Sequence, residues 1–490
     1  MAFVEVAANS DSGAYQIDNS GLFGGAGTFL TKSQSDDESD TDRRKFTVSG
    51  WYKQTLQGSA GGWNGLWSAM VDSNNFTSLK INADKELIFD LNISGTNKSF
   101  TTTRRFRDPA AWYHIVVAYD STDGTAADRL KIYVNGEQAA GTFSADITQN
   151  DPAHWGDDAS AARVGAYGNN TGDSYMHNGY MADVCCTVGY ALAPAQFGEN
   201  DEDSGIWKPK KPSVTYSANG FFCEFQQTGT SQNSSGLGAD TSGKDNHFAI
   251  DSDATQLKST TDTPTNNFCT ANPLVSGFPP NYLVTLSEGN LKVSETSSNW
   301  KPYDSTMGVQ NGKWYWECEN VSGSPADGFM FGIQSQDGSD ITGIFITDNR
   351  YPGYYSGRTG FSYDADGNYR YNGTSTGTGA VTYTNGDTVM LALDMDNGFL
   401  YAGKNGSWNN SGAPTSGSSG TGNVYSGFSG KTITPCNAIN GGDVIAYLNF
   451  GNPVVANDSS NADANGYGDF EYAVPSGYYA LCTKNLAEFG

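Results

Sequence analysis

Residues 387–408, DTVMLALDMDNGFLYAGKNGSW, constrain the fold of this chain more than any other stretch. An apolar run of strand length, residues 389–393, leads into the turn sequence DMDNG and then into a second apolar and aromatic run, residues 399–402. Asn405 and Gly406 follow, and an Asn-Gly pair lets two successive residues adopt positive φ, as a two-residue hairpin turn of the primed type requires. The stretch therefore predicts strand, turn, strand and turn in an antiparallel meander.

The same pattern occurs much earlier, in residues 112–136, WYHIVVAYDSTDGTAADRLKIYVNG. It predicts a strand over residues 114–119, a longer acidic turn over 120–128, a strand over 130–134 and another Asn-Gly turn. With 490 residues, the chain is too long for one ordinary hydrophobic core. Two hairpins so far apart in the sequence predict two antiparallel β domains in tandem.

The composition indicates an all-β protein. The chain has 60 Gly and 27 Tyr, and only 17% of its residues are charged, which favours many short strands joined by tight turns. We predict two tandem antiparallel β-sandwiches, formed by residues 1–204 and 286–490. Residues 205–285 are rich in Pro, Gly, Ser and Asn and begin with the proline-rich sequence WKPKKP, so we expect a long, extended, strand-poor connector.

The charge and the cysteines exclude several classes of function. A net charge of −25 repels phosphate backbones and anionic membranes, so no nucleic-acid partner is expected. No apolar run approaches the roughly 20 residues that cross a bilayer, and residues 1–13 do not resemble a signal peptide, so no membrane insertion is expected. The seven cysteines are odd in number and include no CxxC, so we expect them to be reduced and buried, in a protein that assembles in a reducing cytoplasm.

Four motifs in the first half occur in the order of a known family. They are FTVSGWYK (residues 46–53), AAWYHIVVAYDSTDG (110–124), LKIYVNGEQ (130–138) and GYMADV (179–184). In this order they resemble the laminin-G/concanavalin A-like jelly-roll family, over roughly residues 15–200. The resemblance implies a jelly-roll sandwich of a kind that often binds carbohydrate.

The second half resembles the SPRY domain. The motifs are GKWYWECE (312–319), FGI (331–333), NGDTVMLALDMDNGFLYAGKNG (385–406), YLNFG (447–451) and VPSGYYAL (474–481). They correspond to the family's YWE strand, its central hairpin and its closing N-F-G. This resemblance implies a second β-sandwich that recognises partners through loops at one end.

The order of jelly roll, DTPTNNF connector (262–268) and SPRY-like domain resembles structural proteins of marine tailed bacteriophages. The resemblance implies a non-enzymatic virion protein, such as a tail fibre, a spike or a capsid decoration, on the external surface of the particle. It would bind host surface glycans or other virion proteins, and we expect a homo-oligomer. Two alternatives remain open: a polysaccharide depolymerase on a jelly-roll scaffold, and a pure scaffold or cement subunit without glycan binding.

Candidate catalytic groups are few. Glu317 and Glu319 share one face of a predicted strand, and i,i+2 carboxylates approach the 5–5.5 Å separation of a retaining glycosidase pair. In the SPRY pattern, however, the YWE strand is structural, so we expect no catalytic residues. The four histidines are scattered, and His114 is expected in the core or at the surface rather than as a general base.

No cofactor is expected, although one loop carries weak calcium candidates. Asp120, Asp123 and Asp128 lie in the acidic turn of the first hairpin, and Ca²⁺ prefers carboxylate and carbonyl oxygens. Turn-forming Asp and Gly explain the same residues. Asp394, Asp396 and Asn397 are weaker candidates, because they form the turn of the SPRY-like hairpin.

Aromatic residues in loops are the better binding candidates. The sequence NRYPGYYSGRT (349–359) contains Tyr and Arg, which dominate recognition surfaces, although two of its tyrosines could instead pack inward. Tyr369, Arg370 and Tyr371 would extend the patch. In the first domain Trp63 is a candidate for stacking on sugars, whereas Trp67 is expected in the core. The predicted ligand-binding residues are Trp63, Arg350, Tyr351, Tyr354, Tyr355 and Arg358.

Overall fold

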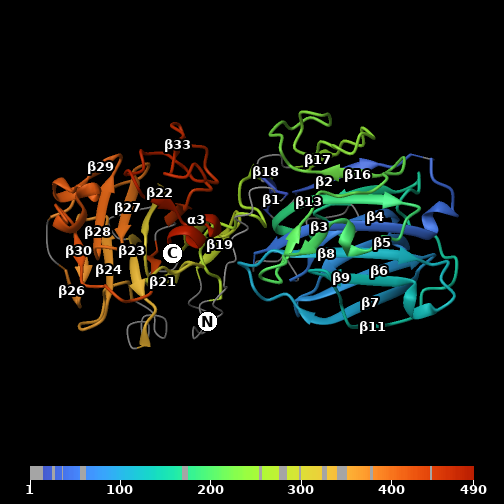
Figure 1. Cartoon of the computed structure of the whole chain (residues 1–490), viewed down its shortest axis with the longest axis horizontal. Helices are drawn as coiled ribbons and strands as arrows, with labels where there is room; N and C mark the ends of the chain where they lie inside the picture. The colour runs from blue at the N-terminus through green and yellow to red at the C-terminus, as the bar shows by residue number, and fades with distance from the viewer. Residues whose placement is uncertain are drawn as a thin grey trace. The chain divides into compact units, whose positions relative to one another are not determined.

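The computed structural model describes residues 15–24, 28–35, 37–55, 62–167, 175–252, 257–274, 284–296, 299–322, 328–338, 350–375, 379–441 and 444–490. The chain divides between Thr265 and Asn266 into two compact units, which we call the first unit and the second unit. Each unit is built from sheets that are antiparallel except for one short parallel pair in the second unit (Figure 1). The predicted all-β class with two tandem sandwiches is therefore confirmed.

The first unit packs two large sheets face to face. One sheet has the order β10-β9-β8-β3-β13-β1-β18, with β16 also paired to β13; the other has the order β11-β7-β6-β5-β4-β12-β2-β17. A short pair, β14 with β15, stands apart from both. The strands are β1 (Ser20–Gly24), β2 (Thr28–Ser33), β3 (Lys45–Gln54), β4 (Asn64–Asp72), β5 (Asn75–Ile81), β6 (Glu86–Ile93), β7 (Thr96–Arg105), β8 (Tyr113–Asp120), β9 (Leu130–Val134), β10 (Glu137–Gln138), β11 (Gly141–Phe143), β12 (Ala161–Val164), β13 (Asn178–Val188), β14 (Gly198–Asn200), β15 (Trp207–Pro209), β16 (Phe221–Cys223), β17 (Ala249–Ser252) and β18 (Leu257–Thr260).

Strand β13 is buried on both of its faces. Side chains alternate along a strand, so the adjacent Cys185 and Cys186 point to opposite sides. Cys186 lies in the core between the two sheets, together with Trp67, as expected for that tryptophan. Cys185 packs on the outer face, beside Phe222 of the paired strand β16 and against Phe197, which lies outside the sheet. A segment of the chain therefore forms a third layer over this sheet.

The predicted connector is not a separate element. Within residues 205–285, β16 pairs with β13, β17 with β2 and β18 with β1, so residues up to Thr265 extend both sheets of the first unit. The boundaries predicted at 204 and 285 are replaced by one division after Thr265. The polar composition misled the prediction, because a strand can be held by backbone hydrogen bonds to a neighbouring strand without an apolar pattern of its own.

A buried ion pair fixes the last part of this segment. Lys53 Nζ lies 2.7 Å from Asp262 Oδ2, and both side chains are almost fully excluded from solvent, at 1% and 0% exposure. Trp112 Nε1 donates a hydrogen bond to the other carboxylate oxygen. Asp262 opens the DTPTNNF sequence, which is therefore anchored to β3.

The second unit also has two main sheets. One has the order β19-β20-β32-β22-β27-β28-β29, with β30 paired to β28 and β35 to β22, and the other has the order β21-β31-β23-β24-β25-β26. Strands β33 and β34 pair with each other. The elements are β19 (Thr285–Ser287), β20 (Lys292–Glu295), β21 (Lys301–Asp304), β22 (Lys313–Ser322), β23 (Phe329–Ser335), β24 (Gly360–Asp364), β25 (Tyr369–Tyr371), β26 (Thr374–Ser375), β27 (Thr388–Asp394), β28 (Phe399–Lys404), β29 (Ser407–Trp408), β30 (Tyr425–Ser426), β31 (Ile433–Ile439), β32 (Val444–Asn449), β33 (Asn461–Ala462), β34 (Asp469–Phe470), β35 (Tyr479–Ala480) and helix α3 (Thr483–Phe489).

Strand β22 is likewise covered on two sides. Trp316 faces the interior of the sandwich and makes an edge contact with Phe331 of the opposite sheet, with ring centroids 6.4 Å apart. Tyr315 faces outward and packs with Phe470 and Tyr478 in a separate apolar cluster. Residues near the end of the second unit thus form a layer over the outer face of the larger sheet.

Both predicted hairpins are confirmed. Strands β27 and β28 pair in antiparallel register, as do β8 and β9. Asn405 has φ 47° and Gly406 has φ 78°, and Asn135 and Gly136 have φ 50° and 80°. Both Asn-Gly pairs therefore adopt two successive positive φ values, as the sequence predicts.

All seven cysteines are free and buried, as expected. Among the residues with described positions, no helix has the length and apolar character needed to cross a bilayer.

Replacing Asp262 by Ala should lower the free energy of unfolding of the first unit by about 3–5 kcal/mol, because it leaves the Lys53 ammonium buried without its counter-ion. Chemical denaturation followed by fluorescence measures the loss. The control is Asp128→Ala, which removes the partly exposed pair with Lys131 and should cost about 0.5 kcal/mol or less. Equal losses in the two variants would show that the Lys53–Asp262 pair does not anchor the segment.

Candidate functional site

The best candidate binding surface lies on the loop before β24 and on β25. Five of its residues are those predicted from the sequence, and one comes from the neighbouring strand. All six side chains are half-buried, so none of the tyrosines is lost to the core. We call this set the Arg–Tyr surface: Arg350, Tyr351, Tyr354, Tyr355, Arg358 and Arg370.

The side chains of the Arg–Tyr surface form one continuous run. The Tyr354 ring meets Tyr351 and Tyr355 edge to face, with centroids 5.1 and 5.0 Å apart. The Arg350 guanidinium lies 4.3 Å from the Tyr354 ring, and that of Arg358 lies 4.5 Å from the Tyr355 ring. Such edge-to-face and cation–π contacts hold the rings in place without burying them.

Hydrogen bonds to the sheet hold the loop backbone. Gly357 N donates to Asn372 Oδ1 at 2.6 Å, and Gly373 N donates to Gly353 O at 3.0 Å. Gly353 has φ +81°, and a Cβ there would lie 2.3 Å from the carbonyl oxygen of Arg370, so only glycine fits. The surface is therefore preorganised, which reduces the entropy lost when a ligand binds.

Two side chains that contact Tyr351 of the Arg–Tyr surface were not among the predicted ligand-binding residues. Trp300 meets Tyr351 edge to face, with centroids 6.1 Å apart. Arg370, named only as an extension of the patch, packs 5.3 Å from the Tyr351 ring and is held by Asp364 Oδ2 at 2.6 Å. Pairing between β24 and β25 brings Arg370 to the loop, and the alternation YRY in the sequence was the only signal for it.

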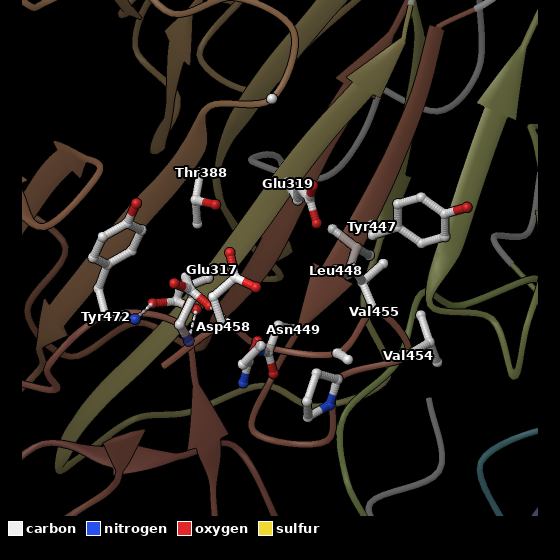
Figure 2. A pocket seen from close by; sticks show the side chains of 15 residues that line it. Glu317, Glu319, Thr388, Tyr447, Leu448, Asn449, Val454, Val455, Asp458 and Tyr472 are labelled. Carbon is white, nitrogen blue, oxygen red and sulfur yellow. Dashed lines mark hydrogen bonds between the residues drawn. The ribbon is translucent and has the colours of Figure 1, made fainter. Parts of the chain in front are cut away.

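A second candidate is a cavity of about 350 Å³ on the outer face of β22. Glu317 and Glu319 project into it from the same face of the strand, as their i,i+2 spacing predicts (Figure 2). Tyr447 and Tyr472 stand on opposite sides in the view. Asp458 and Glu471 also line the cavity, although no pattern in the sequence connects them with β22. The other lining residues are Gly386, Thr388, Leu448, Asn449, Pro453, Val454, Val455, Ala456 and Asn457.

Glu317 is held tightly at the floor of this cavity. Its Oε1 accepts hydrogen bonds from the Tyr315 hydroxyl at 2.6 Å and from Tyr472 N at 2.9 Å, and its Oε2 accepts one from Glu471 N at 2.9 Å. Burial raises the pKa of Glu317 to about 7, and these three donors oppose the rise. Burial also raises the pKa of Glu319, with contributions from the charges of Glu471 and Asp458. The cavity thus gathers carboxylates of raised proton affinity.

Trp63 lies at a smaller aromatic cluster of the first unit. It is half-buried and meets Tyr175 edge to face, with centroids 6.0 Å apart. Lys80 Nζ lies 4.6 Å from the Trp63 ring and 3.6 Å from the Tyr167 ring, and it pairs with Asp90 at 2.6 Å. The exposed part of Trp63 can contact a ligand, but this site offers fewer polar side chains for hydrogen bonds than the Arg–Tyr surface.

The calcium candidates do not converge. Asp120 Oδ2 pairs with Lys45 at 2.9 Å, Asp123 Oδ1 accepts a hydrogen bond from Thr125 N, and Asp128 pairs with Lys131. Each carboxylate is thus engaged in its own turn. In the described ranges no group of three or more His, Cys, Asp or Glu side chains is arranged to hold a metal ion. Asp394 likewise closes its turn, where Asn397 N donates to it, and pairs with Lys313.

His114 illustrates why the buried histidines are structural. Its Nδ1 accepts a hydrogen bond from Trp207 Nε1 at 3.0 Å, so the proton of the neutral ring is on Nε2, which donates to Ser49 Oγ at 2.9 Å. A ring that donates to the serine cannot take its proton, so this Ser–His pair is not a nucleophile with its base. Burial lowers the pKa of His114 to about 3.

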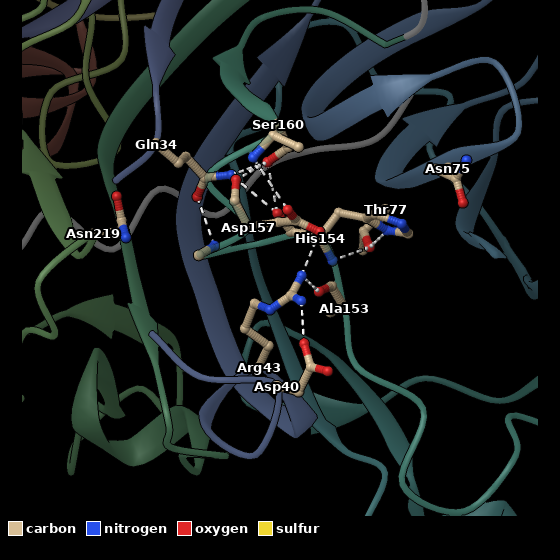
Figure 3. A network of polar contacts seen from close by, with 12 residues as sticks. Gln34, Asp40, Arg43, Asn75, Thr77, Ala153, His154, Asp157, Ser160 and Asn219 are labelled. Atoms are coloured by element: carbon tan, nitrogen blue, oxygen red, sulfur yellow. Dashed lines mark hydrogen bonds and ion pairs between the residues drawn. The ribbon is translucent and has the colours of Figure 1, made fainter. Parts of the chain in front are cut away.

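His154 belongs to a polar network of the first unit (Figure 3). His154 N donates to Thr77 Oγ1, and Gln34 and Ser160 side chains donate to His154 O. Arg43 donates to Ala153 O and pairs with Asp157 within the same network. Burial lowers the pKa of His154 to about 4 and that of His177 to about 3. The network joins loops of the sandwich, which is a structural role.

Comparison with known proteins identifies the first sandwich. Residues 25–185 match the model of the family described as the Concanavalin A-like lectin/glucanases superfamily. The match covers a domain within the first unit and agrees with the jelly-roll resemblance of the sequence. No curated protein matches the chain.

Solved structures similar to the chain include SPRY domains. The SPRY domain of human HERC1 is 17% identical to this chain, with a TM-score of 0.27. The match covers 35% of this chain and 96% of the HERC1 domain chain. A heptameric SAP-like pentraxin from Limulus polyphemus is 18% identical over 37% of this chain and 82% of its own, with a TM-score of 0.27. Domain 4 of an extracellular arabinanase from Geobacillus stearothermophilus, in complex with arabinotriose, is 16% identical over 31% of this chain and 64% of its own, with a TM-score of 0.23.

The two units should respond to acid in opposite ways. His114, His154 and His177 have folded-state pKa values below the unfolded value of about 6.5, so the unfolded first unit binds more protons and loses stability as the pH falls from 7 to 5. The expected loss is about 2 kcal/mol per histidine, offset in part by Asp183, whose pKa burial raises to about 7.

In the second unit, burial raises the pKa of Glu317 and that of Asp304 to about 7. The folded state then binds more protons than the unfolded state between pH 7 and about 4, so this unit gains stability on acidification. Calorimetry of the whole chain at pH 7 and pH 5 measures both transitions, and Asp262→Ala identifies the one that belongs to the first unit. Parallel shifts of the two transitions would contradict the expectation.

Proposed function

We propose that this chain is a non-enzymatic protein that binds polysaccharide, and that the Arg–Tyr surface makes the principal contact. The observation that carries the proposal is the run of half-exposed tyrosine rings, fixed by one another and by arginines on a hydrogen-bonded loop. Tyrosine gives a large, rigid contact area with a polar end, at a low cost in conformational entropy. The aliphatic faces of sugar rings fit such rings, and their hydroxyls fit the phenol and guanidinium groups.

The first unit supports the same class of function. It contains the domain that matches the Concanavalin A-like lectin/glucanases family, and its half-buried Trp63 is a second candidate contact. A chain with a contact in each unit would gain avidity for a repeating polymer. Trp63 is the subordinate site in this proposal, because fewer side chains surround it.

The setting that we propose is the external surface of a tailed-phage particle, assembled in the host cytoplasm. The chain would be a tail fibre, a spike or a capsid decoration, acting as a homo-oligomer among other virion proteins. The resemblance of the motif order to phage structural proteins, the net charge of −25 and the buried free cysteines support this setting. Labelling of intact particles distinguishes the positions: a distal tail site favours host recognition, and a capsid site favours decoration.

One observation favours a second candidate function, a polysaccharide depolymerase. Glu317, with its raised pKa, and Glu319 face one cavity, and a glycosidase needs a protonated carboxyl opposite an ionised one. Against this function, both oxygens of Glu317 already accept hydrogen bonds from its own chain, two of them from backbone groups. We therefore assign Glu317 a structural role, in which it joins β22 to residues 471–472.

Replacing Tyr354 by Ala should weaken polysaccharide binding about tenfold, because it removes the central ring and the contacts that position its neighbours. Affinity electrophoresis in gels containing laminarin, alginate, dextran or host capsule measures the change. The control is Tyr467→Ala, which removes an exposed tyrosine of the same unit away from the Arg–Tyr surface. Absence of binding to any of these polysaccharides, together with burial of the Arg–Tyr surface between subunits in the particle, would favour a pure scaffold instead.

Incubation with the same polysaccharides should release no reducing ends and no unsaturated products. The assay compares the wild-type chain with Glu317→Gln, which keeps the shape of the side chain but cannot supply the proton. Turnover by the wild type that is abolished in Glu317→Gln would establish the depolymerase and end the binding-only proposal. Trace turnover that is equal in both proteins indicates a contaminating enzyme.

A further inference from the structure

Arginine is concentrated at one place in the second unit. Between residues 266 and 490 it occurs only at positions 350, 358 and 370, and all three belong to the Arg–Tyr surface. The chain as a whole carries 53 acidic residues and 28 basic ones. Because the rest of the chain is acidic, three arginines on one surface make that surface electrostatically distinct from its surroundings.

The three guanidinium groups are not equivalent. Arg370 is neutralised by Asp364, whose Oδ2 lies 2.6 Å from both its Nε and its Nη2. Arg358 pairs with no acidic side chain in the described part of the chain, and its Nη1 is buried without a hydrogen-bond partner there. A buried charged donor without an acceptor is costly, and an anion at the exposed part of this half-buried side chain would offset the uncompensated charge.

Arg358 and Arg350 flank the same ring. Their guanidinium carbons lie 4.5 and 5.8 Å from the centroid of Tyr355, and Arg350 Nε donates to the Tyr355 hydroxyl at 3.1 Å. Two like charges close to one ring repel each other, and an anion placed between or beside them lowers that repulsion. The planar guanidinium binds carboxylate and sulfate groups through two parallel hydrogen bonds.

We propose that the ligand of the Arg–Tyr surface is an anionic polysaccharide, whose carboxylate or sulfate groups bind Arg358 and Arg350 while its sugar rings contact Tyr354 and Tyr355. This inference rests on the proposed function and adds the charge of the ligand to it. An acidic glycan meets both requirements of the surface, because it carries anions at intervals along a chain of sugar rings with apolar faces. A neutral glycan would leave the charge of Arg358 without an anionic partner.

The rest of the molecule limits how strongly a polyanion binds. A net charge of −25 repels it at long range, so attraction is confined to the contacts on the Arg–Tyr surface. The number of charges neutralised is therefore small, and the logarithm of the association constant should fall with the logarithm of the salt concentration with a slope of only about one to two. Non-specific binding through a broad basic face would give a steeper slope.

Dextran, carboxymethyl-dextran and dextran sulfate test the proposal, because they share one glucan backbone and differ only in charge. Titration calorimetry with the whole chain should give at least tenfold tighter binding to one or both charged forms than to dextran. The comparison of the two charged forms shows whether carboxylate or sulfate is the better ligand. Arg358→Gln should reduce binding to the charged forms about tenfold, weaken binding to dextran much less than that and lower the salt slope by about one.

Two variants keep the test specific. Lys484→Gln removes one positive charge of the same unit outside the Arg–Tyr surface and should leave binding unchanged. Arg358→Lys keeps the charge but not the planar fork, so it should recover only part of the lost affinity. If Arg358→Gln lowers the melting temperature of the unit, Arg350→Gln replaces it with the same expectation.

The outcomes separate the two levels of the proposal. Equal affinity for dextran and its charged forms, or equal losses in Arg358→Gln and Lys484→Gln, would overturn the anionic ligand while leaving polysaccharide binding in place. Absence of binding to all three polymers and to the wider polysaccharide set would overturn the proposed function itself. Selective loss of the charged polymers in Arg358→Gln supports both.

Discussion

A β-sheet whose two faces are both apolar must be covered on both, and this constraint governs each unit of the chain. Strand β13 is buried along its whole length, with one face in the core between the sheets and the other under residues such as Phe197 and Leu192. On strand β22, the Trp316 side chain packs inside the sandwich, and the Tyr315 side chain packs in a second cluster on the outer face of the sheet. Segments that pack on the outer faces are therefore structural layers of the fold, and removing one would expose apolar surface to water.

The same constraint decides where a ligand can bind. Because the outer faces of β13 and β22 are largely covered, the accessible chemistry around these strands lies at loops and in the gaps between layers. In the second unit the two signs of charge are separated between these places. The arginines line the Arg–Tyr surface, and the carboxylates of Glu317 and Glu319 line the cavity beneath the covering layer. A ligand therefore meets surfaces of opposite chemistry, according to where it approaches.

Local patterns predict those parts of the structure that depend on neighbours in the sequence. The pattern in residues 130–134 gives β9 with its bounds, and the Asn-Gly pairs give both hairpin turns. The loop residues of the Arg–Tyr surface were also predicted, because Tyr and Arg beside Gly and Pro are recognisable without a fold. Patterns of this kind cannot show that a polar segment such as β17 pairs with β2, because the pairing depends on a partner far away in the sequence. Nor can they predict that Asp458 lies in the same cavity as Glu319, because these two residues are also far apart in the sequence.

The covering layer of the second unit has a consequence for how the protein is made. Glu317 accepts a hydrogen bond from Tyr472 N, and the two residues are 155 positions apart. During synthesis, β22 therefore leaves the ribosome long before the residues that cover its outer face. Until they arrive, Tyr315 lacks Phe470 and Tyr478, which pack with it in the folded unit. Exposed apolar surface of this kind favours aggregation of an incomplete chain.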